Sequence, residues 1–406
     1  MALGFSIHGN LQKIILKIKP EKLIQESLKE IRKYDAAIIG GGLAGLALSI
    51  QLARAGHRVI LFEKEKYPFH RVCGEYVSME SWNFLTKLGV DLESLKLPVI
   101  RNLQVTTING KSLQQVLPLG GFGISRYLLD FTLAEIARSK GVVLLENTRV
   151  NDIEFNDDQF LIHTSAEIFS AAVAGGSFGK RSNLDIKWKR PFTTTAKNKL
   201  NNYIGVKYHI HGIFSDDTIA LHTFENGYCG IVKIEDSRYN LCYLTTADNL
   251  QKSNGSIEQM EKTILSNNPF LKNIFSASER CTKDPVTISQ ISFDKKALVE
   301  NHILMTGDAA GMITPLCGNG MSMALHSSKM AAENIHLFLT GKLNRKEMEQ
   351  RYCNQWETQF SRRLRMGRGI QKLSGNPFLM NLFIITGKVF TPAMQWLIRQ
   401  THGESF

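Results

Sequence analysis

A short glycine-rich segment constrains the fold of this chain more than any other feature. Residues 40–45 have the sequence Gly-Gly-Gly-Leu-Ala-Gly, which matches the pattern G-x-G-x-x-G. An apolar run over residues 35–40 predicts a buried strand before it, and residues 43–55 predict a helix that Gly56 ends. Residues 58–63 predict a second buried strand. The segment therefore predicts the first strand–helix–strand unit of a doubly wound α/β fold.

The glycine pattern in this context predicts a dinucleotide site. Gly40 permits a tight turn, Gly42 lets the backbone approach a pyrophosphate, and Gly45 lets the helix pack closely on the strand. The helix N-terminus at Leu43 and Ala44 is expected to stabilise phosphate charge. A glycine turn in an unrelated α/β protein is the alternative, which the two flanking strands and the helix disfavour.

An acidic residue at the end of the second strand supports the same interpretation. Glu63 lies 18 residues after Gly45, and a carboxylate there can accept hydrogen bonds from a ribose diol. Lys64 follows it and is expected at the same site.

A downstream motif distinguishes FAD from NAD. Residues 303–308 form an apolar strand that ends in Gly307-Asp308, and Gly320-Met321 begin a predicted helix after Pro315 and Gly318. The aspartate can hydrogen-bond a ribityl hydroxyl. The helix N-terminus can stabilise negative charge on a reduced flavin. The predicted cofactor is therefore FAD.

These motifs resemble those of the flavoprotein group that includes geranylgeranyl reductases, aromatic hydroxylases and flavin-dependent halogenases. The resemblance covers residues 34–345, and it implies an FAD-binding domain of the glutathione reductase type. Residues 70–75, His-Arg-Val-Cys-Gly-Glu, resemble the R-x-C-G-E segment and favour the geranylgeranyl reductase branch. Ser125-Arg126 with Asp130 resembles the Arg-led helix beside the flavin. The resemblance implies FAD contacts from Arg71, Arg126 and the backbone of Val150.

Two departures from the group affect the expected chemistry. Phe178 stands where the group usually has an aspartate that serves both FAD and NAD(P)H, so NADH or NADPH is only a candidate electron donor. Residues 227–232, Gly-Tyr-Cys-Gly-Ile-Val, occupy the place of a Trp-x-Phe-Pro or Trp-x-Trp-x-Ile-Pro signature. Their sequence disfavours a halogenase and weakens the case for prenyl reduction.

Strand and helix patterns divide the chain into four parts. The discontinuous FAD-binding domain is predicted over residues 34–98, 123–190 and 285–345, and an inserted substrate lobe over residues 99–122 and 191–284. The alternating apolar runs and turns of residues 203–245 predict an antiparallel sheet in that lobe. Residues 1–33 predict a basic amphipathic extension, and residues 346–406 a C-terminal helical region. Asn381, Lys388 and Pro392 interrupt the apolar stretch 378–398, which argues against a transmembrane helix.

Cys73 and Cys317 are the candidate catalytic residues, with pocket shaping as their expected role. Both lie in glycine-flanked segments that the resembled group places around the flavin. A small buried hydrophobe is the alternative for Cys73. Met321 and Met323 are expected to pack mainly in the core. The histidines and cysteines have no metal-binding spacing, so no metal site is predicted.

The formal charge of +12 is unevenly distributed. Residues 1–33, 180–199 and 342–399 are strongly basic. Solvated surfaces are one explanation, and attraction to an anionic substrate, a nicotinamide phosphate or a membrane surface is another. Nucleic acid is disfavoured because no binding motif accompanies the charge. The N-terminus lacks a signal-peptide pattern, so a cytoplasmic location is expected, with peripheral membrane association as an alternative.

The leading functional hypothesis is an FAD-dependent oxidoreductase that acts on an apolar or aromatic small molecule, isoprenoid or polyketide-like, by hydride transfer from reduced flavin. A flavin-dependent monooxygenase that hydroxylates an aromatic substrate is the first alternative, because both reactions use this scaffold. An FAD-binding protein without turnover is the second. The sequence predicts no oligomeric state.

Overall fold

The strand before the glycine loop is central to a largely parallel sheet. The computed structural model describes residues 32–194, 202–314, 318–374, 377–401 and 403–406, so Cys317 and nearly all of the predicted N-terminal extension lie outside the described residues. β1 (Arg32–Ile39) ends in four buried apolar residues and lies within the strand order β16-β17-β9-β1-β2-β6. The remaining strands of this sheet are β2 (Val59–Phe62), β6 (Val143–Leu145), β7 (Val150–Asn156), β8 (Gln159–Thr164), β9 (Ile168–Gly176), β16 (Val299–Glu300) and β17 (Ile303–Met305). Strands β17, β9, β1, β2 and β6 run parallel, which confirms the predicted α/β fold.

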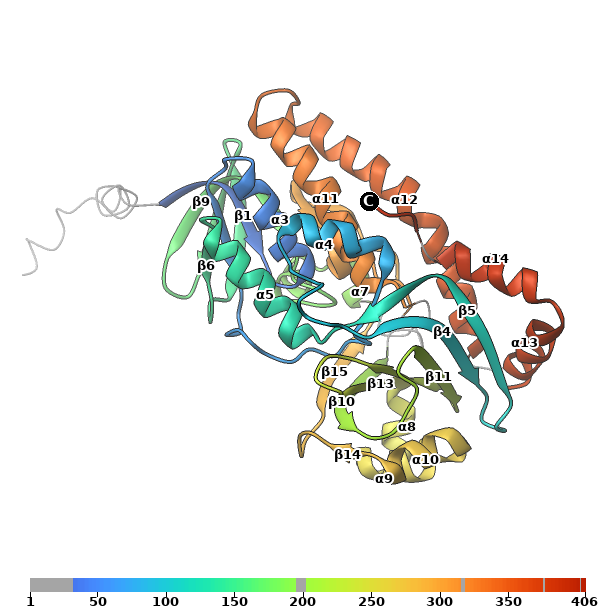
Figure 1. The fold of residues 1–406 in the computed structure, drawn as a ribbon. Coiled ribbons are helices and arrows are strands. Elements are labelled where there is room, and N and C mark those ends of the chain that lie inside the picture. Colours follow the sequence, from blue (N-terminus) through green and yellow to red (C-terminus); the bar gives the residue numbers. More distant parts are fainter. Residues whose placement is uncertain (1–31, 195–201, 315–317, 375–376, 402) are drawn as a thin grey trace, which may run out of the picture.

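Three helices form a layer against this sheet. α3 (Leu43–Arg54) packs between α5 (Arg126–Ser139) and α11 (Gly320–Leu339), as Figure 1 shows. Nine of the twelve residues of α3 are buried, because the helix is apolar on nearly every side. Each of the three helices confirms a helix predicted from the sequence.

The second sheet has nine strands and is mainly antiparallel. Its order is β14-β10-β13-β12-β11-β4-β5-β3, and β15 also pairs with β10. The predicted antiparallel sheet over residues 203–245 is confirmed by β10 (Tyr203–His211), β11 (Thr218–Phe224), β12 (Gly227–Lys233) and β13 (Tyr239–Thr246). The other strands are β3 (Tyr76–Ser78), β4 (Val99–Thr106), β5 (Ser112–Gly123), β14 (Glu279–Arg280) and β15 (Val286–Ile291). β4 pairs with β11 in parallel, which joins two segments far apart in sequence.

The domain boundaries stay a prediction, but two strands show how closely the two parts are interleaved. β3 lies within the predicted segment 34–98 and β15 within 285–345, yet both join the nine-stranded sheet. The short helices are α4 (Trp82–Leu88), α6 (Asn183–Lys187), α7 (Pro191–Thr194), α8 (Ala247–Lys252), α9 (Ile257–Thr263) and α10 (Pro269–Ala277).

The C-terminal part is helical, as predicted. α12 (Arg345–Ser374) packs along α11, and α13 (Pro377–Val389) and α14 (Thr391–Thr401) follow it and reach β5 (Figure 1). Within the described part of the chain, none of these helices combines the length and the apolar character needed to span a bilayer.

A fully buried arginine fixes the loop after β17. Arg190 Nη1 donates to Asp185 Oδ1 at 2.8 Å, and its Nη2 donates to the Ala297 carbonyl at 2.9 Å. Both nitrogens also lie 3.3 Å from the carbonyl of Ala309. Because Ala309 closes the short 3₁₀ turn Gly307–Ala309, Arg190 holds the turn that contains Asp308.

We expect Arg190→Met to lower the free energy of unfolding by about 3–5 kcal/mol, because it leaves the buried Asp185 carboxylate without its cation. Denaturant unfolding of the purified protein measures this difference. The control is Lys252→Met, which breaks an exposed ion pair with Glu225 and should cost less than about 1 kcal/mol. Equal losses in the two variants would contradict this role.

Candidate functional site: a dinucleotide crevice at the junction of the two sheets

The carboxyl ends of three parallel strands lie side by side at one edge of the first sheet, and we call this edge the crevice because open α/β sheets bind ligands there. Ile39 of β1 is in register with Phe62 of β2 and with Gly176 of β9. Gly40, with φ +102°, turns the chain out of β1, and a Cβ on Gly45 would lie 2.0 Å from the Gly40 carbonyl oxygen. Ligands of open α/β sheets bind at such strand ends.

The residues at this crevice fit a bound pyrophosphate. Gly42 is the N-cap of α3 in an extended conformation, and the helix has neither a side-chain cap nor an acidic residue in its first turn. The first N–H groups of α3, at Leu43 and Ala44, are therefore available to an anion. A Cβ on Gly42 would lie 3.6 Å from Arg126 Nη2, so a cation also faces the glycine loop.

Glu63 is placed as predicted at the end of β2, but protein groups already contact its carboxylate. The residue is 3% exposed, and Oε2 accepts hydrogen bonds from Gly41 N and Arg71 Nη2, both at 2.9 Å. Glu65 N donates to Oε1 at 3.1 Å. Glu63 therefore orders the glycine loop and Arg71 together. Lys64 is more than half exposed and pairs with Glu65, so its cofactor contact stays a prediction.

Arg71 and Arg126 share one buried carboxylate. Arg71 Nε lies 3.1 Å from Asp130, and Arg126 makes two bonds of 2.7 Å to the same side chain. Burial opposes the charge of Arg126, but Asp130 more than offsets this effect and raises the pKa of Arg126 above its usual range. The structure thus brings both predicted arginines to the glycine loop, and their contact with FAD stays a prediction.

The second predicted motif lies beside the first. Gly307 follows β17, and its added Cβ would lie 3.1 Å from the Cβ of Ala44 at the start of α3. Gly307, Asp308 and Gly320 line a small pocket with residues of α11. Lys296, which the sequence analysis did not identify, donates to the Asp308 carbonyl at 2.8 Å. Burial lowers the pKa of Lys296 to about 8.

Val150, Met321 and Met323 contact other parts of the protein. Val150 is buried, and its carbonyl accepts a hydrogen bond from Asn183 Nδ2 at 3.0 Å, so its adenine contact stays a prediction. Met321 and Met323 are both buried in the main hydrophobic core, as expected. Phe178 packs edge-on against Trp188 and belongs to the same apolar surroundings.

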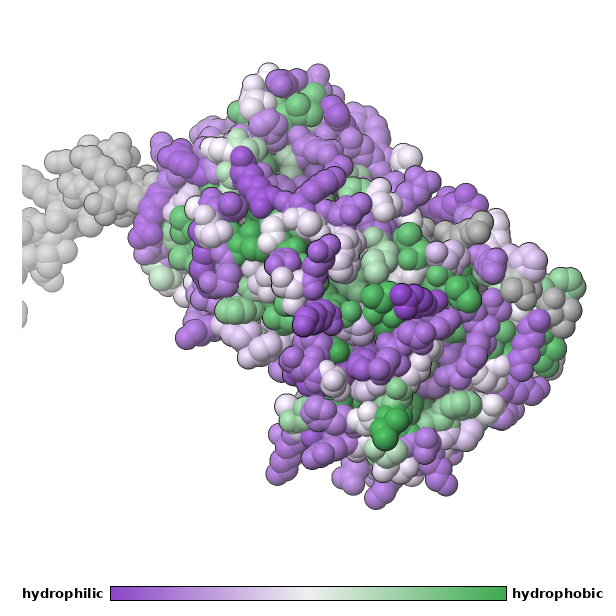
Figure 2. All heavy atoms as spheres, viewed as in Figure 1, coloured by the Kyte–Doolittle hydropathy of each residue, from purple (hydrophilic) through white to green (hydrophobic). Residues whose placement is uncertain are grey.

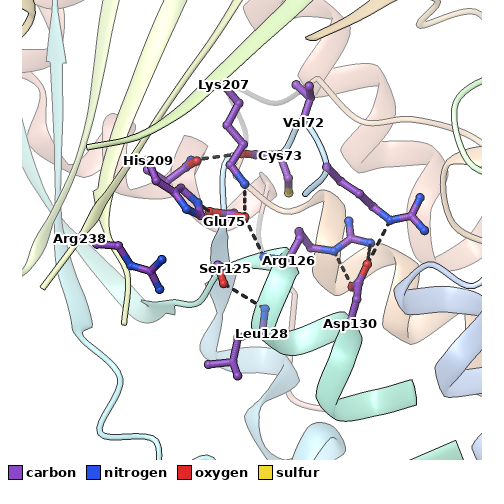
Figure 3. Close-up of polar contacts among 12 residues, drawn as sticks. Val72, Cys73, Glu75, Ser125, Arg126, Leu128, Asp130, Lys207, His209 and Arg238 are labelled. Carbon is purple, nitrogen blue, oxygen red and sulfur yellow. Dashed lines mark hydrogen bonds and ion pairs between the residues drawn. The ribbon is translucent and has the colours of Figure 1, made fainter. Parts of the chain in front are cut away.

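A buried charged cluster connects the second sheet with the start of α5. Glu75 has no exposed surface; Lys207 Nζ lies 2.5 Å from its Oε1 and His209 Nε2 lies 2.6 Å from its Oε2. Arg126 N also donates to Glu75 Oε1 at 2.7 Å. Figure 3 shows Lys207 and His209 pointing from the second sheet toward Glu75, next to Arg126 at the start of α5. Glu75 is therefore a buried acceptor and not a surface acid.

The protonation of this cluster follows from its surroundings. Burial alone would raise the pKa of Glu75, but the Lys207 ammonium and the His209 hydrogen bond outweigh it and lower that pKa below 4.5. His70 packs edge-on against His209. Burial, followed by repulsion from Lys207, lowers the pKa of His70 to about 4. Glu75 is thus an anion and His70 is neutral near pH 7.

Cys73 belongs to the same cluster. Its carbonyl accepts a hydrogen bond from Asn240 Nδ2 at 3.1 Å, and its thiol lies against the Arg126 guanidinium (Figure 3). The structure thus places the Cys73 thiol beside Arg126, and its role in shaping the flavin pocket stays a prediction. Cys317 lies outside the described residues, so its proximity to the flavin stays a prediction. Among the described residues, no three His, Cys, Asp or Glu side chains gather as metal ligands would.

Part of the chain matches a known protein family. Residues 33–163 match the FAD binding domain family. The chain is 25% identical over 366 residues to conditioned medium factor receptor 1 of Dictyostelium discoideum, covering 82% of this chain and 69% of the relative. It is 25% identical over 331 residues to a kynurenine 3-monooxygenase of Myxococcus xanthus, covering 73% and 69%.

Solved structures share the fold. A flavin-dependent brominase superposes with a TM-score of 0.72 at 18% identity, covering 90% of this chain and 93% of that one. A geranylgeranyl bacteriochlorophyll reductase-like protein from Thermoplasma acidophilum gives a TM-score of 0.71 at 17% identity, covering 85% and 88%. At these identities the likeness shows the fold alone.

We expect Gly42→Asp to weaken FAD binding by at least about tenfold, a change of ~1.4 kcal/mol, because it places a carboxylate where the pyrophosphate must lie. Fluorescence titration of the apoprotein with FAD measures the affinity. Gly42→Ala is the matched control, since its Cβ makes only an ordinary contact with Arg126 and should weaken binding less. Full FAD occupancy in the aspartate variant would show that residues 40–45 do not hold the pyrophosphate.

We expect Glu75→Gln to lower the free energy of unfolding at pH 7 by about 3–5 kcal/mol, because Lys207 loses its buried counter-charge. The lowered pKa means that ionised Glu75 stabilises the fold above its ordinary pKa of 4.5. This stabilisation is lost as the pH falls through the lower pKa of the folded state. The difference between parent and variant should therefore shrink in urea unfolding below pH 4.5, and a constant difference would refute the assignment.

Proposed function

We propose that this chain, a member of the FAD-binding flavoprotein superfamily, is an FAD-dependent oxidoreductase that reduces a carbon–carbon double bond in an apolar isoprenoid or polyketide-like molecule. The observation that carries this proposal is the buried cluster of Glu75, Lys207 and His209 beside the predicted cofactor site. Reduction of a double bond requires a proton as well as a hydride, and this cluster holds protons away from bulk water.

The residues at the crevice have separate tasks in this proposal. The N-terminus of α3 and Arg126 hold the pyrophosphate, and Glu63 holds a ribose. Bound FAD supplies the hydride chemistry once it is reduced. Lys207 and His209 hold protons against the Glu75 carboxylate. In the proposed reaction the Cys73 thiol gives its proton to the substrate carbon, and the cluster then returns a proton to the thiolate.

The surroundings of the cluster suit an apolar substrate. Tyr76, the residue after Glu75, packs with Ile100, Leu117, Val232 and Ile398. Its hydroxyl is buried and has no hydrogen-bond partner among the described residues. A single polar atom on an otherwise apolar substrate would satisfy this hydroxyl.

A flavin-dependent monooxygenase is the second candidate. Its specific support is the likeness to a protein named kynurenine 3-monooxygenase over 73% of this chain. The same buried cluster would then exclude water from an oxygen reaction at the flavin. The brominase supports the fold alone, and residues 227–232 of this chain form β12 without the tryptophans typical of halogenases. The FAD-binding protein without turnover is the remaining alternative.

The decisive experiment reduces the FAD-loaded protein with dithionite under nitrogen and then adds geranylgeraniol or a phenol. We expect flavin reoxidation under nitrogen with loss of one double bond, because the alkene accepts the hydride. Reoxidation only in air with a hydroxylated phenol would support the monooxygenase instead, and a product that requires added bromide would support a halogenase. Absence of all three products would favour the protein without turnover. Separate titration with NADH and NADPH tests the electron donor.

We expect Cys73→Ser to leave FAD binding unchanged within about twofold and to slow anaerobic reoxidation by the alkene at least about tenfold, because the serine hydroxyl is a weaker acid than the thiol. Stopped-flow absorbance of the flavin measures the reoxidation rate. Cys353→Ser, in α12, is the matched control and should change neither quantity. A normal rate in Cys73→Ser would remove this thiol from the proton path.

A further inference from the structure

The C-terminal helix pair carries an exposed apolar surface. Six of the thirteen exposed large hydrophobic residues in the described part of the chain lie on the β5 strand, α13 and α14 or in the turn between these helices. They are Val116, Leu119, Leu382, Ile385, Phe390 and Trp396, and we call them the apolar tip. Phe390 is 62% exposed and Trp396 53% exposed. Figure 2 shows apolar residues at the right-hand end of the molecule, where Figure 1 places α13.

Packing of α13 and α14 does not require these side chains. Met380, Ile384 and Met394 are buried in an apolar cluster with Leu113 of β5. Ile398 is buried in a neighbouring cluster with Leu117. Each helix therefore has one apolar side packed on the protein and further large apolar side chains exposed. Contiguous exposed apolar residues of this kind indicate an interaction surface.

The segment that carries the helix pair is rich in basic residues. Residues 358–403 contain seven Lys and Arg residues and no Asp or Glu. Arg362, Arg365 and Arg368 of α12 and Lys388 of α13 are exposed. The nearest acids along the chain are Glu357, which pairs with Lys295, and Glu404. Basic residues flanking exposed aromatic and aliphatic side chains are typical of proteins that lie on anionic bilayers.

We propose that the apolar tip and its basic surroundings dock this protein on the surface of a bilayer that contains anionic lipids. Phe390 and Trp396 enter the boundary between headgroups and acyl chains, and the arginines contact lipid phosphates. The docking is peripheral, because no helix in the described residues meets the requirements for crossing a bilayer. A second copy of the chain fits less well, because a two-fold contact would bring two basic surfaces together.

The docking surface lies near the candidate site, so it would also bring an apolar substrate from the bilayer to that site. This role rests on the proposed function. A cleft beside the apolar tip has Leu117, Leu119 and Ile398 on its apolar wall, and Gln359, Arg363, Glu404 and Ser405 supply its polar lining. Leu117 and Ile398 pack in the same cluster as Tyr76, the residue after Glu75. An apolar substrate dissolved in the bilayer would therefore meet, at the docking surface, a cleft whose apolar wall packs against Tyr76 beside Glu75.

Flotation of the full-length, FAD-loaded protein with vesicles tests the docking without any turnover. The vesicles are phosphatidylcholine alone, or phosphatidylcholine with about 30% phosphatidylglycerol. We expect binding to the anionic vesicles at least about tenfold tighter, and weakened by salt. Phe390→Ser with Trp396→Ser, and separately Arg365→Glu with Arg368→Glu, should each weaken binding at least about tenfold while FAD stays bound.

The matched control is Ile213→Ser, which changes a fully exposed apolar residue between β10 and β11 and should bind as the parent does. Unchanged vesicle binding in both double variants would overturn the proposal, since another segment of the chain would then bind the vesicles. Dimerisation in sedimentation velocity that the Phe390 and Trp396 substitutions abolish, without vesicle binding, would assign the surface to a second copy. Loss of alkene reduction with vesicle binding intact would contradict the proposed function and leave the docking surface supported.

Discussion

The buried carboxylate of Glu75 is the contact on which the junction between the second sheet and α5 depends. It lies in the loop before β3, whereas its partners Lys207 and His209 lie on β10, 132 and 134 residues further along the chain. Removing an ionised carboxylate from water costs several kcal/mol unless cations and hydrogen bonds replace its hydration. The second sheet can therefore meet the start of α5 only in the arrangement that brings Lys207 and His209 to the carboxylate bound by Arg126 N.

The same carboxylate orders the groups around the predicted flavin. Glu75 accepts a hydrogen bond from Arg126 N, so it fixes the first residue of α5. Arg126 in turn binds Asp130, which also binds Arg71, and Arg71 reaches Glu63 beside the glycine loop. Ion pairs, linked by the hydrogen bond from Arg126 N to Glu75, thus connect β10 of the second sheet with the end of β2 of the first. In the proposed reaction, this continuity keeps the proton-holding groups at a constant distance from the cofactor site.

Local patterns predicted much of the fold, because their causes are local. The glycine loop, its two flanking strands and the helices α5 and α11 follow from short-range periodicity and turn chemistry. The alternation of residues 203–245 likewise predicted β10 to β13. The parallel pairing of β4 with β11 and the addition of β3 to the second sheet depend on contacts between distant segments, so no local pattern indicates them. Lys207 was missed for the same reason. A lysine inside the apolar strand Val206–Ile210 was the available signal, but its partner lies 132 residues away.

The cations at the candidate site differ from those of the C-terminal surface in how they are paired with carboxylates. The sequence left open whether the basic excess attracts an anionic substrate, a nicotinamide phosphate or a membrane. At the crevice, Arg71 and Arg126 face Glu63 and Asp130, and Lys207 faces Glu75, so these cations are neutralised by neighbouring carboxylates. Residues 358–403 contain seven Lys and Arg residues and no Asp or Glu, and Arg363 among them pairs with Glu80. Cations without nearby carboxylates attract anions outside the protein, whereas cations paired with carboxylates mainly stabilise the contacts that they make. The basic excess therefore favours attraction at the C-terminal surface over attraction into the candidate site.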